Sequence, residues 1–174
     1  KGHMCSPAIA TQAEDLIAGG VKELIHVGYA GGLQPELVPG DIILTDGAFN
    51  DTAVARLYGY DYERIRSSKD LTNQIEEMIT SAEIPYKRGL HWTTDAGYRE
   101  TWGQVMDYRD KGALCVEMEG VGLFTIANYR KCVATGIYVV SDVYSENDWK
   151  LGWEGNDIKR AVGAVIDMII ESIR

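Results

Sequence analysis

The chain has 174 residues, of which 45% are hydrophobic and 25% charged, and its formal net charge at pH 7 is -9. This length suits one hydrophobic core, so we expect a single domain over residues 1–174. The acidic balance excludes a nucleic-acid partner, because binding a phosphate backbone requires clustered Lys and Arg. No stretch approaches the ~18 consecutive apolar residues of a membrane-spanning helix, so we expect no membrane partner.

Cysteine and histidine are too scattered to predict a disulfide framework or a metal site. The chain has three cysteines, which are Cys5, Cys115 and Cys132. An odd number without close spacing is typical of free thiols in a reducing compartment, and we therefore expect a cytoplasmic protein. The three histidines lie far apart in the sequence and lack the spacing of metal ligands, so we expect neither a metal nor a cofactor.

Helices and strands alternate through the first half of the chain. Ser6 and Pro7 suit the N-cap and first position of a helix, which a pair of glycines ends. A buried strand over 22–29 then leads into a glycine-rich turn, and a second strand covers 40–49. Residues 51–68 fit either a surface loop or a short helix.

The second half continues the alternation. Asp70 is the expected cap of a helix over 70–83. The next elements are strands over 85–95, 113–119 and 132–142 and helices over 100–112 and 120–130. The last helix begins near Glu154, and its predicted buried stripe is Ile158, Val162, Val165, Ile166, Ile169 and Ile173. This alternation predicts an α/β fold with a mixed central sheet flanked by helices.

Polar or glycine-rich segments follow three of the predicted strands: 28–32, 117–120 and 141–142. In open α/β sheets, ligands bind beyond the carboxyl ends of strands. A glutamate there can accept two hydrogen bonds, as a ribose diol requires, or can interact with the dipole of the following helix. Asp142 follows an apolar run, so we expect a desolvated carboxyl that could donate a proton, or alternatively a helix cap or loop residue.

The order of these segments resembles one family, the nucleoside phosphorylases of the hexameric purine and uridine type together with the related nucleosidases. "GHMCSPAIATQAEDLI" is similar to the family's Gly-Met-Gly-x-Pro segment, and "HVGYAGGLQPELVPGDIILTD" to its phosphate-turn strand and the Gly-Asp strand that follows. "TTDAGYRET" resembles its base-pocket segment, and "VEMEGVGLFTIA" and "VVSD" resemble its two best-known signatures. The resemblance covers nearly the whole chain in the family's order.

The resemblance implies roles for individual residues. Glu119 matches the glutamate that holds the ribose hydroxyls, while Met118 and Met4 match methionines that contact the sugar. Asp142 matches the aspartate that protonates the departing purine. The expected base-binding residues are Ser141, Thr94 and Tyr98. The expected phosphate or water site consists of Gly28, Tyr29 and His26.

Some positions depart from the family pattern. His26 stands where family phosphorylases usually carry Arg, and Tyr29 stands where they carry Ser or Thr. Gly97 replaces the base-stacking Phe of many relatives. A neutral imidazole and a bulky phenol are poor substitutes in a phosphate site. The family also has several strands before the Gly-Met segment, and since this chain begins at Lys1, we expect a fragment or a shortened relative.

The implied function is cleavage of the N-glycosidic bond of a nucleoside, with a weak leaning toward purine. Phosphate would be the acceptor in a phosphorylase and water in a nucleosidase. A non-catalytic nucleoside-binding or assembly domain is the alternative from another class. The resemblance further implies a homo-oligomer, either a dimer or a hexamer. Residues 47–68, which are rich in tyrosine and include Phe49 and Leu57, are the expected subunit contact.

Overall fold

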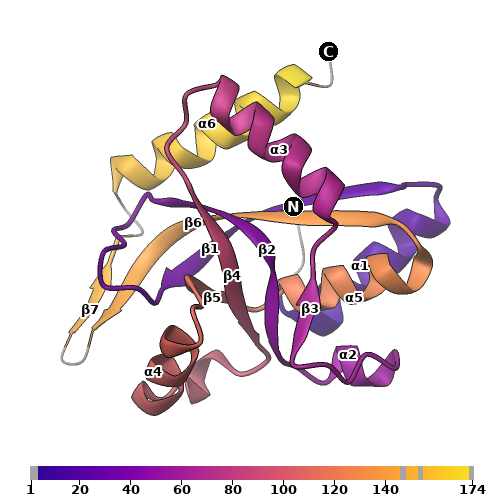
Figure 1. Cartoon of the computed structure of the whole chain (residues 1–174), viewed down its shortest axis with the longest axis horizontal. Helices are drawn as coiled ribbons and strands as arrows, with labels where there is room; N and C mark the ends of the chain where they lie inside the picture. The colour runs from indigo at the N-terminus through magenta and orange to yellow at the C-terminus, as the bar shows by residue number, and fades with distance from the viewer. Residues whose placement is uncertain (1–3, 146–147, 153–154, 173–174) are drawn as a thin grey trace.

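The protein is a mixed α/β fold with a central sheet flanked by helices, as seen in the computed structural model, which describes residues 4–145, 148–152 and 155–172 (Figure 1). The strands are β1 (Glu23–Gly32), β2 (Ile42–Asp51), β3 (Arg64–Arg66), β4 (Lys87–Thr94), β5 (Cys115–Glu117), β6 (Val133–Ser145) and β7 (Asp148–Leu151). The helices are α1 (Ser6–Ala18), α2 (Val54–Leu57), α3 (Lys69–Ser81), η1 (Gly97–Arg99, a 3-10 turn), α4 (Trp102–Asp110), α5 (Gly120–Arg130) and α6 (Asn156–Ser172).

The sheet has the strand order β3-β2-β4-β5-β1-β6-β7, and it closes on itself through one further pairing. Residues Ile42–Leu44 at the start of β2 pair antiparallel with the β6 segment Ile137–Val139. Strands β2, β4, β5, β1 and β6 therefore form a closed ring. Side chains that point into this ring are shielded from water on all sides, so any polar group there needs a partner within the protein.

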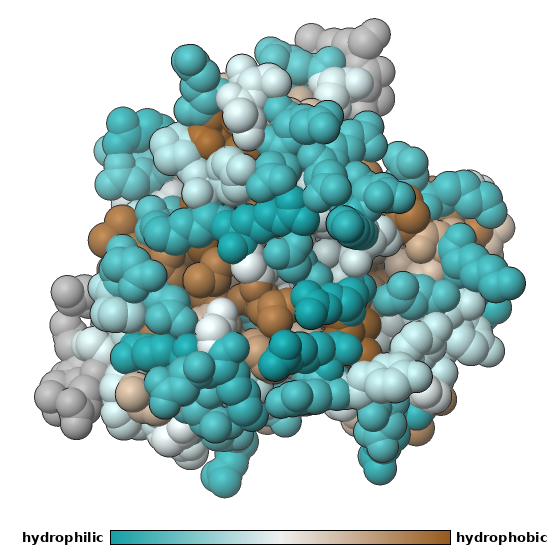
Figure 2. Space-filling model, viewed as in Figure 1, coloured by the Kyte–Doolittle hydropathy of each residue, from teal (hydrophilic) through white to brown (hydrophobic). Residues whose placement is uncertain are grey.

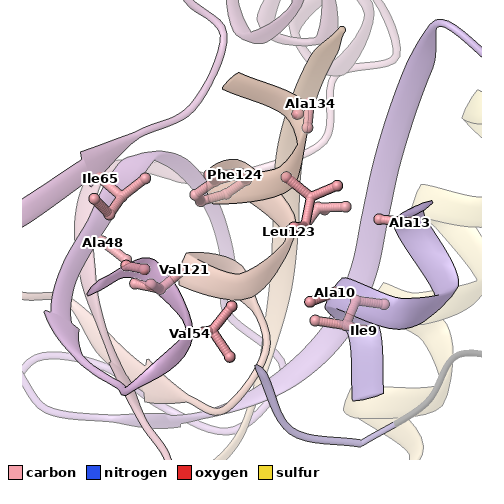
Figure 3. Close-up of a cluster of buried hydrophobic side chains, with 13 residues drawn as sticks. Ile9, Ala10, Ala13, Ala48, Val54, Ile65, Val121, Leu123, Phe124 and Ala134 are labelled. Atoms are coloured by element: carbon pink, nitrogen blue, oxygen red, sulfur yellow. The ribbon is translucent and has the colours of Figure 1, made fainter. Parts of the chain in front are cut away.

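Apart from α4 and η1, the helices lie in two groups around the sheet (Figure 1). Helices α3 and α6 lie together over one face, whereas α1, α2 and α5 lie on the other side (Figure 1). The core beneath α3 and α6 includes Ile75, Ile137 and Val165. The core around α5 brings together residues from helices and strands far apart in the sequence, among them Ile9, Val54 and Phe124 (Figure 3).

Glycine lets α1 and α5 approach closely. A Cβ atom at Gly122 would lie 2.6 Å from the backbone oxygen of Ser6 and 2.9 Å from Cγ2 of Ile9. No side chain fits in that space. Because α1 precedes the first strand and α5 follows the "VEMEG" segment, this contact ties the beginning of the described chain to the predicted ribose site.

Two helix starts differ from the predictions. Ser6 is the first residue of α1 rather than its cap, and its hydroxyl instead donates a hydrogen bond to the backbone oxygen of Met118 at 2.9 Å. The cap position of α3 is Ser68, not Asp70, which lies in the first turn. Ser68 is held there because its hydroxyl accepts the backbone N–H of Ala134 on β6 at 2.9 Å. In both cases a hydrogen bond to a residue far away in the sequence determines the role of the serine at the helix start.

Strand boundaries also differ. The glycines at 28–32 lie within β1 rather than in a turn, since β1 pairs with β6 along its whole length. Strand β6 continues past Asp142 to Ser145 and returns as β7, a hairpin that was not predicted. In the region 51–68 the short-helix alternative is correct, and the strand β3 accompanies it. The predicted strand 113–119 shortens to β5, the three residues Cys115–Glu117.

The last helix follows its predicted stripe only in part. Ile158, Val165 and Met168 are buried against the sheet. Ile166 is 42% exposed, so its assignment to the buried face is wrong, because only one face of α6 meets the sheet. The predicted start at Glu154 and the residue Ile173 lie outside the described residues.

The surface is predominantly hydrophilic in the view of Figure 2, with smaller apolar patches between the charged side chains. Among the described residues, no helix has the length and apolar character needed to cross a bilayer.

We expect Gly122→Ala to lower the free energy of unfolding by about 1–3 kcal/mol, since the added methyl group forces α1 away from α5. Gly163→Ala is the matched control, because a Cβ there meets nothing within 4 Å and Ala favours a helix over Gly by up to about 1 kcal/mol. Urea unfolding of both variants measures the difference. Equal stability of the two variants would contradict the close packing of α1 on α5.

Candidate active site

Strand pairing brings the "VEMEG" turn close to the "VVSD" segment. Gly31 of β1 pairs with Val116 of β5 on one side and with Asp142 of β6 on the other. On the far side of β5, Glu117 pairs with Thr93 of β4. The "VEMEG" turn and the "VVSD" segment therefore flank the same glycine, although they lie on different strands.

Glu117, the first glutamate of the turn, is a buried structural carboxylate. Its Oε2 accepts the backbone N–H groups of Glu119 and Gly120, both at 2.8 Å. Its Oε1 accepts the Thr93 hydroxyl at 2.5 Å and lies 3.0 Å from Nε2 of His91. Burial acts to raise the pKa of the Glu117 carboxyl, but the His91 charge, the His91 hydrogen bond and the Thr93 hydroxyl hold that pKa below its ordinary value. Glu117 is thus ionised and fully engaged within the protein.

Glu119, the second glutamate, is half-buried and differently placed. Its Oε1 accepts the backbone N–H of Cys5 at 2.5 Å. Burial, followed by the charge of Glu117, raises the pKa of Glu119 to about 7, against the smaller opposing effect of the Cys5 and Met118 N–H groups. Glu119 therefore changes protonation near neutral pH. As a carboxylate it can accept hydrogen bonds from two vicinal hydroxyls.

Cys5 has an unusual backbone that serves this contact. Its φ of 75° lies in the left-handed region, which a non-glycine residue adopts rarely. Such conformations cost of order 1–3 kcal/mol and persist where surrounding contacts enforce them, often at functional sites. Here the conformation directs the Cys5 N–H toward Glu119, just before α1 begins.

The two methionines predicted to contact the sugar are both connected to Glu119. Met118 precedes Glu119 in the sequence, and Met4 precedes Cys5, whose N–H bonds to Glu119. Met118 is half-buried, and a Cβ at Gly97 would lie 3.7 Å from its sulfur atom. Met4 precedes Cys5 and is 74% exposed. Met118 thus forms part of the wall between the turn and η1, while the Met4 side chain extends toward solvent.

Asp142 and Ser141 form a buried pair beside Gly31. The Ser141 hydroxyl lies 2.5 Å from Oδ1 of Asp142 and 3.3 Å from the backbone oxygen of Ala30, and can donate its proton to either. A Cβ at Gly31 would approach Oδ2 of Asp142 to 3.2 Å and the Tyr144 ring to 2.6 Å. Glycine at this position therefore allows both side chains to pack against β1.

A second carboxyl, which the sequence did not reveal, lies close to Asp142. The Tyr144 hydroxyl donates to Oε2 of Glu100 at 2.8 Å. Burial raises the pKa of Glu100, and the Asp142 charge adds to the increase, while the Tyr144 hydrogen bond opposes it. Glu100 precedes α4 and Tyr144 lies beyond the predicted end of β6, so no local sequence pattern could have paired them.

The predicted base-binding residues on the β4 side are placed differently from one another. Thr94 is buried, with its hydroxyl 3.4 Å from Oδ2 of Asp51 and accepting the backbone N–H of Ala96 at 3.3 Å. Tyr98 lies in η1 with a fully exposed side chain. Thr94 is thus engaged with Asp51 on β2, whereas the Tyr98 ring faces solvent.

The predicted phosphate or water site lies on β1 and is largely uncharged. His26 is half-buried, with Nδ1 3.4 Å from the Tyr138 hydroxyl, and burial lowers the pKa of its imidazole. A Cβ at Gly28 would lie 3.1 Å from the His26 ring, and the Tyr29 side chain is 47% exposed. His26 is therefore neutral at pH 7 and can offer an anion a hydrogen bond but not a full positive charge.

His91 and Thr45 are two further buried polar residues, and sequence reasoning assigned neither of them a role. The Thr45 hydroxyl lies 2.6 Å from Nδ1 of His91, whose side chain is fully buried. Within the described part of the chain, no group of three or more His, Cys, Asp or Glu residues could hold a metal ion.

Comparisons with known proteins identify the family of the chain. The profile of the phosphorylase superfamily matches residues 2–171. The purine nucleoside phosphorylase DeoD-type of Exiguobacterium sibiricum is 33% identical over 139 residues, covering 78% of this chain and 59% of the relative. The protein of the same name from Caldanaerobacter subterraneus subsp. tengcongensis is 34% identical over the same share of this chain and 60% of its own length.

A solved structure, that of the P. knowlesi homolog of P. falciparum PNP, has the same fold. It matches with a TM-score of 0.79 at 23% identity, over 94% of this chain and 66% of the other. The chain spans about three fifths of the length of the curated relatives it matches. Because the superfamily profile extends over nearly all of its residues, the chain belongs to the phosphorylase superfamily.

Proposed function

We propose that this protein cleaves the N-glycosidic bond of a purine nucleoside, with inorganic phosphate as acceptor and without a cofactor. The observation that supports it most is the pairing of Gly31 with both Val116 and Asp142, which sets the Glu119 turn and the Ser141–Asp142 pair on either side of one glycine. A site of this kind offers a carboxylate for the sugar and a carboxyl for the base. The names of the relatives, purine nucleoside phosphorylases, support the same chemistry.

The residues suit the steps of the reaction. As the bond between C1′ and the base nitrogen breaks, its electron pair moves onto the base and C1′ becomes cationic. Asp142 donates a proton to the base, and Ser141 orients that carboxyl. Glu119 accepts hydrogen bonds from the ribose hydroxyls and holds the sugar for attack by a phosphate oxygen at C1′. The products are the free base and a ribose 1-phosphate.

Water is the second candidate acceptor, and His26 is the observation in its favour. Burial lowers the pKa of His26, so a phosphate dianion would meet a neutral imidazole on this strand. A neutral group binds an anion more weakly than a guanidinium does, because it lacks a full charge and the paired donor geometry. A water molecule carries no charge, so its binding requires neither a cation nor a pair of donors.

We also infer that the protein is cytoplasmic and forms a dimer or a hexamer. Leu57 and Tyr62, in the region predicted to contact another subunit, are 79% and 62% exposed. Phe49, from the same region, is fully buried within its own chain and is not available for such a contact. The three cysteines are free thiols, in keeping with a reducing compartment.

Titrating phosphate into a purine-release assay tests the proposed function. We expect the rate of base release from inosine to rise with phosphate to saturation, with ribose 1-phosphate as the product. Sulfate at equal ionic strength is the control for a salt effect. Release that is independent of phosphate and yields free ribose would identify a nucleosidase. Nucleoside binding without release would identify a binding domain.

Glu119→Gln should weaken nucleoside binding by about 1.5–3 kcal/mol, the usual loss for a hydrogen bond to a charged group. The free base should bind almost as before, because it has no ribose. Calorimetric titration with inosine and hypoxanthine measures both affinities, and Glu77→Gln on the exposed face of α3 is the matched control. Equal losses for nucleoside and base would mean that Glu119 has only a structural role.

Asp142→Asn should reduce turnover of natural purine nucleosides by about 10²–10⁴-fold, the range typical of general acid catalysis. The amide keeps the shape of the side chain but cannot donate a proton to the base in the same way. A nucleoside with a leaving group that needs no protonation should lose far less. Asp70→Asn, on the exposed first turn of α3, is the control. Wild-type rates with both substrates would place the acid elsewhere.

A further inference from the structure

A chain of buried polar groups crosses the closed ring of strands and ends at the Glu119 turn. Thr45 of β2 contacts His91 of β4, and His91 contacts Glu117 of β5. The side chains of His91 and Glu117 are 0% and 1% exposed. Glu117 then accepts the backbone N–H of Glu119 at 2.8 Å. A continuous series of hydrogen bonds therefore links the interior of the ring to the backbone of the predicted ribose ligand.

The proton on His91 faces Glu117. An ionised carboxylate can only accept hydrogen bonds, so Nε2 of His91 carries the hydrogen in the 3.0 Å contact with Oε1. The other ring nitrogen is fixed by Thr45, whose hydroxyl also bonds to the backbone of Gly47. His91 thus has one orientation, with its donor directed at the carboxylate.

The helix start is shaped around this imidazole. A Cβ at Gly120 would lie 2.5 Å from Nε2 of His91 and 2.9 Å from the Tyr138 hydroxyl. Only glycine lets the first turn of α5 lie so close to His91. The two residues whose N–H groups Glu117 accepts, Glu119 and Gly120, are therefore fixed both by the carboxylate and by contact with the ring.

We propose that His91 is a positioning residue, which acts through Glu117 to hold the turn that presents Glu119 to the sugar. This inference rests on the proposed function in one respect, namely that Glu119 binds a ribose. His91 itself does not touch the substrate. Its contribution is to supply a donor to a buried carboxylate that would otherwise be under-satisfied and free to rearrange.

The groups that face Glu119 determine the pH at which its carboxyl ionises. They include the Glu117 carboxylate, the N–H groups of Cys5 and Met118, and the Tyr138 hydroxyl of β6, whose pKa the Glu119 charge helps to raise. The negative charge of Glu117 disfavours ionisation of Glu119, whereas the N–H groups favour it. A change that removes only the charge of Glu117 should therefore alter the pH at which Glu119 becomes a carboxylate.

The first experiment compares His91→Leu, which removes the donor, with His91→Gln, which keeps an N–H donor. We expect His91→Leu to weaken inosine binding by about tenfold or more, as for the loss of a hydrogen bond to a charged group, and to leave hypoxanthine binding within about twofold. His91→Gln should recover most of the loss. Amide hydrogen exchange at Glu119 and Gly120 should accelerate in His91→Leu and not in Thr125→Val. Thr125→Val removes a buried α5 hydroxyl that has no partner among the described residues.

The second experiment uses Glu117→Gln, which keeps the shape of the side chain and removes its charge. In the wild-type protein, inosine affinity should increase as the pH rises through about 7, because Glu119 ionises there. This rising limb of the plot of affinity against pH should move to lower pH in Glu117→Gln. A purely structural Glu117 would leave the limb in place. An unchanged limb, or equal losses of inosine and hypoxanthine in His91→Leu, overturns the inference. Wild-type protein that binds no nucleoside overturns the proposed function instead, and with it the sugar-binding role assigned to the turn.

Discussion

The buried Glu117 carboxylate needs hydrogen-bond donors on both oxygens, and much of the structure around it supplies them. Removing a charge from water costs several kcal/mol unless paired groups compensate. Here the compensation comes from β4, through His91 and Thr93, and from the backbone at the start of α5. The strand register, the closed ring and the glycine at the helix start can all be understood as conditions for burying this one charge.

This requirement separates the two glutamates of "VEMEG", which the sequence alone presents as equivalent. Glu117 faces inward and has its oxygens occupied by protein donors. Glu119 lies half-buried at the helix start, where one oxygen accepts the Cys5 N–H. The charge of Glu117 raises the pKa of Glu119, so the buried glutamate also influences the protonation of the glutamate proposed to bind the ribose.

Local sequence patterns were enough to predict the α/β class and most helices. The family resemblance, rather than local patterns, singled out Glu119 and Asp142, whose roles stay predictions. Apolar periodicity locates helices such as α6, and short motifs locate polar groups near strand ends. Patterns of this range could not show that His91 pairs with Glu117, because the contact depends on the register of two strands separated in sequence. The continuation of β6 beyond Asp142 was missed for the same reason, since the β7 hairpin that stabilises it follows later in the chain.

The closing contact between β2 and β6 has a consequence for how the protein folds. It joins Ile42–Leu44 to Ile137–Val139, so most of the described chain lies in the loop between them. Closing so long a loop carries an entropic cost that must be met before the contact contributes, and topologies of this kind fold slowly. The ring should therefore close late, after local helices have formed. Until then the Glu117 carboxylate remains hydrated, and a newly synthesised chain would acquire its helices well before the turn proposed to bind the sugar.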